Sequence, residues 1–502
     1  MPKTPSDTEL INFHKEGFLS FHSLNRDIVR IAYWLCILAS VLFLSSCINA
    51  KRSFPPSSGR FLLYIHSTTT SPPDVDFTIS GIDLETDDGR IIKVVEDTIN
   101  ISSIALAAGQ VLLKEAAVEP ASYRAIKIRI SRATINKKEG PVSLALPEPD
   151  GMLSVKANFT IRKNESYVCS LEWNSLRSIE DRYRFQPYIG VELQMPSPRG
   201  LLLFVSNRGS NYITIIDRSR ERVIGAVTVG DGPSGMAINS LQDQLYVVNS
   251  GSRSISVIGT SQFRLLATIQ LPGGMGPSDI TFVPDQVASE GTQLSLDGKL
   301  YITNRISNDV TVVSTATSHM LGIVPVGNHP SHIAADLVRK EIYVTNERSN
   351  DLNIISVADD RVVGTIAVNR SPTGIAVGKD KLYIFNEGSN NISIVSPSSR
   401  KVVGTITLAA SPKRGMVGFG GRIFIADTSA DRVTFLSQLD FITRELPVSR
   451  GPINITGDER RNRIYVTNSG DNSVSVIDPV GEKVSKKIFV GLNPFGVTLI
   501  DR

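Results

Sequence analysis

The stretch IYVTNSGDNSVSVID (residues 464–478) decides the fold, because the chain repeats it. Close variants are LYITNRISNDVTVVS (300–314), IYVTNERSNDLNIIS (342–356) and LYIFNEGSNNISIVS (382–396). Aligned copies place one polar residue at intervals of about 40 residues, at Asn207, Asn249, Asn304, Asn346, Asn386, Asp427 and Asn468. A proline follows each at a nearly constant distance, at Pro233, Pro277, Pro330, Pro372, Pro412, Pro452 and Pro494. Two markers in step seven times indicate a repeat array over residues 201–502.

Each repeat contains four β segments, which around Asn386 are KLYIFN (381–386), NISIVS (391–396), KVVGTITL (401–408) and GMVGFG (415–420). Four short strands in about 40 residues are typical of a propeller blade, and no helical periodicity favours a solenoid. The array opens on a second-type strand, LLLFVSN (201–207), and ends on a first-type strand, PFGVTLIDR (494–502). The last strand can therefore complete the first blade and remove the open sheet edges. We expect an all-β fold with a seven-bladed β-propeller.

The motif YVTN at 343–346 and 465–468, together with its period, resembles the YVTN family of β-propellers. The resemblance covers residues 201–502 and implies the propeller fold. The repeated Asn is itself expected to be structural, bonding nearby backbone in the turn that follows it.

The N-terminal region has the pattern of a targeting signal. Residues 31–46 read IAYWLCILASVLFLSS, which follows basic residues and is short of the roughly 20 residues that span a bilayer. Leu44-Ser45-Ser46-Cys47 resembles the lipobox of bacterial lipoproteins, which implies cleavage before Cys47 and lipid attachment to it. The alternative is a plain signal anchor with an incidental cysteine.

We therefore predict a signal peptide with an extended n-region at 1–46, whose true start is open between Met1, Leu24 and Val29. A lipid-bearing Cys47 and a Pro/Ser tether would occupy 47–59, giving an extracytoplasmic, membrane-anchored protein of the cell envelope. Residue 48 is Ile rather than the Asp that by resemblance retains lipoproteins at the inner membrane. The outer membrane or cell surface is therefore favoured.

Residues 60–195 read as a β-sandwich domain of short strands separated by turn signals. Ile126, Ile128 and Ile130 alternate with charged residues, which places the isoleucines on one face of a strand. Further strands are expected in 61–69, 75–86, 154–163, 166–173 and 187–194, and residues 196–200 are expected to be a linker. The order of the strands around AAVEPASYRAIKIRI (116–130) resembles a lipoprotein domain of unknown function.

Composition excludes several functional classes. The net charge is only +4, and no basic run indicates a nucleic-acid partner. The three cysteines, Cys36, Cys47 and Cys169, form no haem-attachment or zinc motif, so we predict no cofactor and no metal. Cys169 is expected to be a small buried apolar residue.

Functional residues are best sought where one repeat departs from its siblings. The residue two after each proline is Gly235, Asp279, His332, Gly374, Arg414, Asn454 and Gly496. In propellers this position lies at one mouth of the central channel, so the four polar residues Asp279, His332, Arg414 and Asn454 would converge as a ligand-binding site. Lys413, Arg370 and Arg450 would add positive potential and favour an anionic ligand. The alternative is that these residues only line a wet channel.

Two other features of the sequence are weaker evidence of function. His329 and His332 form at most half of a metal site. The long interval within 283–298 is read as a neutral loop insertion.

These observations predict a non-enzymatic platform that binds a protein or a surface polymer. The alternative is a propeller enzyme or redox-accessory subunit, since propellers of similar repeats include lactone hydrolases and cofactor-bearing subunits. Asp279 with His332 is the candidate acid/base pair, but no nucleophile motif accompanies it, so no catalytic residue is assigned.

Overall fold

A computed structural model describes residues 55, 57–69, 72–107, 109–147, 150–195, 200–285 and 297–501, and Phe54–Arg502 form one compact unit. Cys47 and its neighbours lie outside the described residues, so the lipoprotein signal stays a prediction. The central part of the insertion, 286–296, lies outside them as well. No helix among the described residues is long and apolar enough to cross a membrane.

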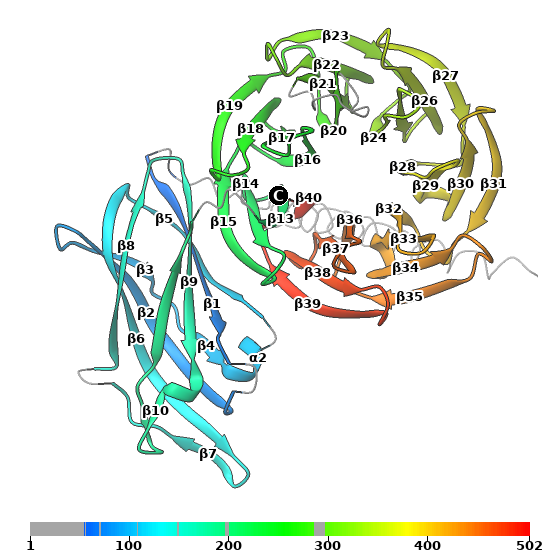
Figure 1. The fold of residues 1–502 in the computed structure, drawn as a ribbon. Helices are drawn as coiled ribbons and strands as arrows, with labels where there is room; N and C mark the ends of the chain where they lie inside the picture. The colour runs from blue at the N-terminus through cyan, green and yellow to red at the C-terminus, as the bar shows by residue number, and fades with distance from the viewer. Residues whose placement is uncertain are drawn as a thin grey trace, which may run out of the picture. The chain divides into compact units, whose positions relative to one another are not determined.

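Residues 201–501 form a β-propeller, in which four-stranded antiparallel sheets surround a central hollow (Figure 1). Seven such sheets occur in the described residues. Every inner strand begins at a repeated proline: β40 (Pro494–Asp501), β16 (Pro233–Ile238), β20 (Pro277–Pro284), β24 (Pro330–Asp336), β28 (Pro372–Val377), β32 (Pro412–Gly418) and β36 (Pro452–Asp458). Every second strand ends at the repeated Asn or Asp: β13 (Leu201–Asn207), β17 (Gln244–Asn249), β21 (Gly298–Asn304), β25 (Glu341–Asn346), β29 (Leu382–Asn386), β33 (Arg422–Asp427) and β37 (Arg463–Asn468). The two sequence markers are therefore the two ends of one strand pair.

The outer half of each sheet completes the repeat. The third strands are β14 (Tyr212–Asp217), β18 (Ser254–Gly259), β22 (Asp309–Ser314), β26 (Asp351–Ser356), β30 (Asn391–Ser396), β34 (Arg432–Ser437) and β38 (Ser473–Asp478). The outer strands are β15 (Arg222–Thr228), β19 (Arg264–Gln270), β23 (Met320–Pro325), β27 (Arg361–Ala367), β31 (Lys401–Thr407), β35 (Thr443–Pro447) and β39 (Lys483–Phe489). Short 3-10 helices follow β29 and β33 at η2 (Glu387–Ser389) and η3 (Thr428–Ala430), and a third, η1 (Ser175–Arg177), precedes the propeller.

The prediction that the last strand closes the first sheet is confirmed. β40 pairs antiparallel with β13, so the first sheet has the order β15-β14-β13-β40. Arg218 reinforces this closure: its side chain is fully buried, it ion-pairs with Asp458 and Asp501, and its Nη2 donates to the carbonyl of Ile500 at 2.9 Å. The first and last blades are thus held together by both backbone and charge.

The repeated Asn is structural, and some copies bond nearby backbone as expected: Nδ2 of Asn207 donates to the carbonyl of Tyr212 at 3.0 Å. Other copies bond side chains. Nδ2 of Asn346 donates to Asp351 Oδ1 at 2.6 Å and to Asn353 Oδ1 at 2.8 Å. These acceptors are side chains of the following strand rather than backbone of the turn. Asp427 reverses the polarity, since it accepts from Thr434 and lies 3.6 Å from Nε of Arg432. The residues five and seven positions later therefore change together with the repeated residue.

The N-terminal part contains two sheets. One has the order β12 (Tyr188–Leu193), β9 (Ser166–Asn174), β1 (Gly59–Ser67), β5 (Val111–Val118). The other contains β3 (Ile91–Val95), β2 (Val75–Thr86), β6 (Ala121–Lys137), β7 (Gly140–Ser143), β4 (Ile99–Ser102) and β8 (Met152–Ile161). A short helix α2 (Ser103–Ala107) and a small sheet of β10 (Ile179–Glu180) and β11 (Arg184–Phe185) complete this part.

The two sheets share one hydrophobic core, to which Ile126, Ile128 and Ile130 contribute as the alternation predicts. Cys169 is fully buried in the same core, and burial raises the pKa of its thiol. β1 is buried on both faces, because Leu62 and Tyr64 turn away from this core and pack with residues of the first and last blades.

Candidate functional site

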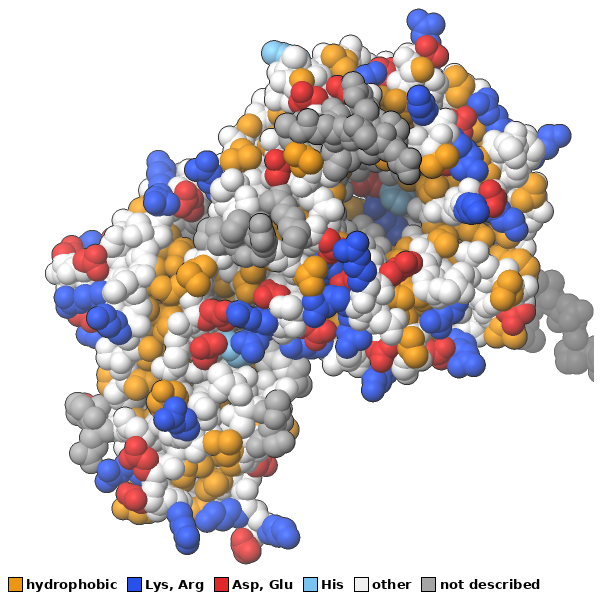
Figure 2. All heavy atoms as spheres, in the orientation of Figure 1, with side chains coloured by type: hydrophobic (Ala, Val, Ile, Leu, Met, Phe, Trp, Pro, Cys, Tyr) orange, Lys and Arg blue, Asp and Glu red, His pale blue; other side chains and the backbone are white. Residues whose placement is uncertain are grey.

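The channel mouth is the end of the hollow at which the inner strands begin, and it contains Asp279, His332, Arg414, Arg208 and Phe495. Figure 2 shows acidic, basic and histidine side chains inside the hollow of the ring. Asp279, His332 and Arg414 stand near the start of β20, β24 and β32, directly after a shift in strand register next to the proline. They come from three different blades.

Asp279 is the meeting point of this cluster and is only 4% exposed. Its Oδ2 lies 3.0 Å from Nη2 of Arg414 and 3.5 Å from Nε2 of His332. Its Oδ1 accepts from the backbone N–H of Ile280 at 3.1 Å. Burial raises the pKa of this carboxyl, and the charge of Arg414 opposes the rise. A Cβ on Gly235 would collide with Asp279, which explains why the neighbouring blade keeps glycine at this position.

His332 is held as a neutral imidazole. Its Nδ1 accepts from the backbone N–H of Ile375 at 2.9 Å, so the ring proton is on Nε2, which faces Asp279. Burial, and then the charge of Arg414, hold the pKa of His332 well below its usual value. The neutral His332 and the ion pair of Asp279 with Arg414 together form a polar wall of the channel mouth.

Asn454 has different contacts from the other three predicted residues. Its Oδ1 accepts from the N–H of Ile455 at 2.9 Å, and its own N–H donates to Thr467 Oγ1 at 3.2 Å. Among the described residues it makes no hydrogen bond with Asp279, His332 or Arg414. The structure therefore brings three of the four predicted residues together, and the place of Asn454 in the site stays a prediction.

Sequence reasoning missed the residues that directly follow the repeated Asn. Cζ of Arg208 lies 3.9 Å from the centroid of the Phe495 ring, and Cζ of Arg414 lies 5.0 Å from it. Burial, and then the nearby charges of Arg414 and Arg305, lower the pKa of Arg208 to about 10. The sequence contained a usable signal, because this position reads Arg208, Ser250, Arg305, Glu347, Glu387, Thr428 and Ser469.

Carboxylates pair with two of the other cations at the mouth, Arg305 and Lys413. Nη2 of Arg305 lies 2.7 Å from Oε2 of Glu347, which also lies 3.0 Å from Nδ1 of His329. Nζ of Lys413 lies 2.5 Å from Oε2 of Glu387. The positive potential that Lys413 was expected to add is therefore largely neutralised by its ion pair.

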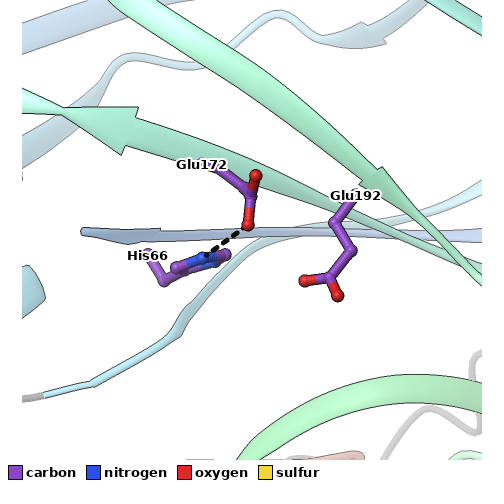
Figure 3. A group of neighbouring side chains, drawn as sticks. All are labelled: His66, Glu172 and Glu192. Atoms are coloured by element: carbon purple, nitrogen blue, oxygen red, sulfur yellow. Dashed lines mark ion pairs between the residues drawn. The ribbon is translucent and has the colours of Figure 1, made fainter. Parts of the chain in front are cut away.

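A second polar cluster lies between the N-terminal sheets and the first blade. His66, Glu172 and Glu192 place a ligand atom each within 4.8 Å of one another, and Figure 3 shows the ion pair between His66 and Glu172. Arg222 of β15 contacts Nε2 of His66, and Nη1 of Arg220 lies 2.7 Å from Oε1 of Glu192.

Each of the three residues thus has a guanidinium close by, since Nη1 of Arg222 also lies 3.9 Å from Oε1 of Glu172. Burial, and then the charges of Arg222, Lys486 and Arg220, lower the pKa of His66 to about 3. We assign this cluster to the packing of the two parts. The three residues are far apart in the sequence, so no spacing signal could have identified it.

Comparison with known proteins bears on the fold alone. No family model matches the chain, and no curated protein matches it. A functionally unknown protein from Desulfotomaculum acetoxidans is 12% identical, with a TM-score of 0.51 over 60% of this chain and 99% of that one. Hydrazine synthase from Kuenenia stuttgartiensis is 18% identical, with a TM-score of 0.47 over 56% of this chain and 96% of that one. Virginiamycin B lyase from Staphylococcus aureus is 16% identical, with a TM-score of 0.45 over 54% and 92%.

Proposed function

We propose that this chain is a lipid-anchored extracytoplasmic binding protein whose propeller holds a ligand at the channel mouth. One observation carries the proposal: residues that do not repeat between blades converge there from four of them. Arg208, Asp279, His332 and Arg414 belong to the first, third, fourth and sixth blades. Convergent polar groups in a concave site are the usual mark of a binding site.

Binding is favoured over catalysis by the state of the candidate acid/base pair. The carboxylate of Asp279 faces Arg414, and Nδ1 of His332 is occupied by a backbone N–H. Within the described residues no hydroxyl or thiol is hydrogen bonded to the His332 ring, so a nucleophile activated by it is absent there. General-base catalysis requires an imidazole or carboxylate that can reach a proton on the substrate or nucleophile. The geometry suits a preformed wall better than a proton-transfer pair.

Kinship with the YVTN propellers and the address of the protein are part of the proposal. The YVTN motif, the Pro/Ser tether and the lipobox-like Leu44–Cys47 together support a propeller displayed from a membrane, with the outer membrane or cell surface favoured. Two or more acyl chains on Cys47 would give stable anchoring, since each buried CH₂ contributes about 0.8 kcal/mol. The partner would be a protein or a surface polymer.

The anchor is tested by replacing Cys47. Cys47→Ala expressed in a bacterial host should lose incorporation of labelled palmitate and leave the membrane fraction. Cys36→Ala is the matched control, because Cys36 lies inside the apolar run and should keep both. Equal palmitate incorporation in Cys47→Ala and the unaltered chain would refute lipidation at this residue.

The binding site is tested by capture from native envelopes. The full chain, cross-linked and purified in detergent, should retain a partner that is lost from the variant Asp279→Ala/His332→Ala/Arg414→Ala. Arg264→Ala is a control away from the mouth, because Arg264 is exposed at the start of the outer strand β19. A partner retained equally by the triple variant would place the binding surface elsewhere.

A further inference from the structure

Arg208 is the one guanidinium of the mouth cluster that no carboxylate of the described residues neutralises. Arg414 lies 3.0 Å from Asp279 Oδ2 and Arg305 lies 2.7 Å from Glu347 Oε2, whereas the side chain of Arg208 makes no ion pair and no hydrogen bond with any described residue. Its charge rests on the face of Phe495. The cluster of three arginines and two carboxylates therefore carries one surplus positive charge.

The surroundings of Arg208 do not favour a free cation. Arg414 and Arg305 lie close enough to disfavour its charged form, with Asp279 only partly offsetting them. Its Nε is buried without a hydrogen-bond partner. A ring face stabilises a cation by about 0.5–2 kcal/mol, while removing a charged group from water without a partner costs more than that. The arrangement is thus unfavourable until a negative group enters.

The free end of Arg208 is open to such a group. Arg208 is partly exposed, and unlike its Nε, its two Nη atoms are not among the buried atoms without partners. Cζ of Arg208 lies 3.9 Å from the ring centroid of Phe495, so this ring covers one side of the guanidinium. A planar, oriented fork of N–H donors matches the oxygen atoms of a carboxylate or a phosphate.

The other walls of the mouth would leave an anion undisturbed. Asp279 forms an ion pair with Arg414, and the neutral His332 places its Nε2 3.5 Å from Asp279 Oδ2. We propose that the channel mouth binds an oxyanion, either a carboxylate or a phosphate or sulfate group, and that Arg208 is its principal anchor. This proposal rests on the proposed binding function and names the chemical class of its ligand.

The test uses the full chain in detergent and calorimetric titration with sodium phosphate, sodium sulfate and sodium acetate at constant ionic strength set by sodium chloride. We expect saturable binding of at least one of the three. Tighter binding of phosphate and sulfate would identify a phosphate-type ligand, and tighter binding of acetate a carboxylate. Either result supports the proposal, and absence of saturable binding with all three overturns it.

Variants show whether Arg208 is the anchor. Arg208→Gln should raise the Kd by at least about tenfold. Arg208→Lys keeps the charge but not the fork of N–H donors, so its Kd should lie between those of the unaltered chain and Arg208→Gln. Arg264→Gln, an exposed guanidinium at the start of the outer strand β19 and away from the mouth, should stay within about twofold. An unchanged Kd in Arg208→Gln or in Arg208→Lys overturns the assignment of the anchor, and each variant tests it if the other fails to fold.

Failure of this inference and failure of the proposed function are distinguishable. If no oxyanion binds but capture of the envelope partner still depends on Asp279, His332 and Arg414, the binding function stands and the oxyanion proposal falls. If oxyanions bind through Arg208 while the triple variant captures the partner unchanged, the site exists but is not where the partner binds.

Discussion

Two arginines of the first blade, ten positions apart, stand in opposite electrostatic situations. Arg208 follows β13 and Arg218 follows β14, and since these strands are antiparallel the two residues lie at opposite ends of the blade. Arg218 is 2% exposed, pairs with Asp458 and Asp501 and donates to the carbonyl of Ile500. Arg208 has no carboxylate partner among the described residues and lies on Phe495. In both, Nε is buried without a partner, so the difference lies at the outer nitrogen atoms.

The difference separates scaffold from site in this propeller. A buried charge whose partners come from the same fold helps to specify which strands meet, as Arg218 does where β36 and β40 join the first blade. A buried charge without a partner in the protein does not help to specify which strands meet. We therefore expect its partner to be a bound ligand. The following predictions test this contrast, beginning with the largest expected effect.

Replacing Arg218 should be the most damaging of these changes. Arg218→Ala leaves Asp458, which is 4% exposed, buried without its counter-charge, so the free energy of unfolding should fall by about 3–5 kcal/mol. Urea unfolding followed by far-ultraviolet circular dichroism measures the loss. A change below about 1 kcal/mol would show that ring closure does not depend on this pair.

Two further variants sharpen the result for Arg218. Arg220→Ala is the matched control, because the Arg220 side chain is 57% exposed and its pairing with Glu192 should be worth about 1 kcal/mol or less. Arg218→Met/Asp458→Leu removes both charges and should recover part of the lost stability, since well-packed apolar replacements of buried pairs are often neutral.

Asp427 is a charge that is only partly compensated, and we expect its cost to appear as a pH dependence. Burial raises its pKa to about 6, while Thr434 and Arg432 act against the rise. Below the ordinary value near 3.8 both the folded and the unfolded chain carry the proton. As the pH rises toward 6 only the unfolded chain releases it, so stability should fall by about 1.4 kcal/mol per pH unit.

The variant Asp427→Asn isolates this contribution. Its unfolding free energy, compared with that of the unaltered chain, should gain by about 3 kcal/mol between pH 4 and pH 7, less whatever Arg432 loses with its partner. Subtracting the two profiles cancels the other titrating groups. A flat difference would mean that Arg432 compensates Asp427 as completely as Asp458 compensates Arg218.

The repeated Asn is an uncharged buried residue whose partners lie within the fold, so it extends the comparison with Arg218 to a neutral side chain. Asn346→Ala removes two buried hydrogen bonds to Asp351 and Asn353, so the free energy of unfolding should fall by about 2 kcal/mol. Asn328→Ala is the control, because Asn328 is exposed and should stay within about 0.5 kcal/mol. Equal stability of the two variants would remove the structural role assigned to the repeated residue.

The fold was predictable because its rules are repeated. Each blade has Asn, or Asp in one case, at the end of its second strand and a proline at the start of its inner strand, so one sequence repeats the same requirement seven times. The same repetition identified Asp279, His332 and Arg414 as departures from glycine. The sequence did not predict which of these residues contact each other. Arg414 approaches Asp279 across the hollow, and this contact depends on the curvature of the ring.

The missed residues have two different causes. Arg208 and Arg305 stand beside a repeated residue that itself looked fully explained, so the position next to it was not compared between blades. His66, Glu172 and Glu192 come together only because β1, β9 and β12 are neighbours in one sheet, and the sequence contains no marker of that order. Comparison of the repeats thus predicts which positions the blades share and at which positions they differ. It predicts nothing about residues outside the repeat array.

Replacing Arg208 should have the smallest effect on stability, and this small effect is what distinguishes it from Arg218. Arg208→Met keeps an apolar contact with Phe495 and removes a charge that Arg414 and Arg305 disfavour. In chloride buffer the free energy of unfolding should therefore change by less than about 1 kcal/mol, in either direction. In a buffer of the same ionic strength that contains the oxyanion bound most tightly in the titration, the unaltered chain should gain stability, by the linkage between ligand binding and folding, and Arg208→Met should not. A loss of more than about 2 kcal/mol in chloride would show that Arg208 has a structural partner after all, and the contrast with Arg218 would then fail.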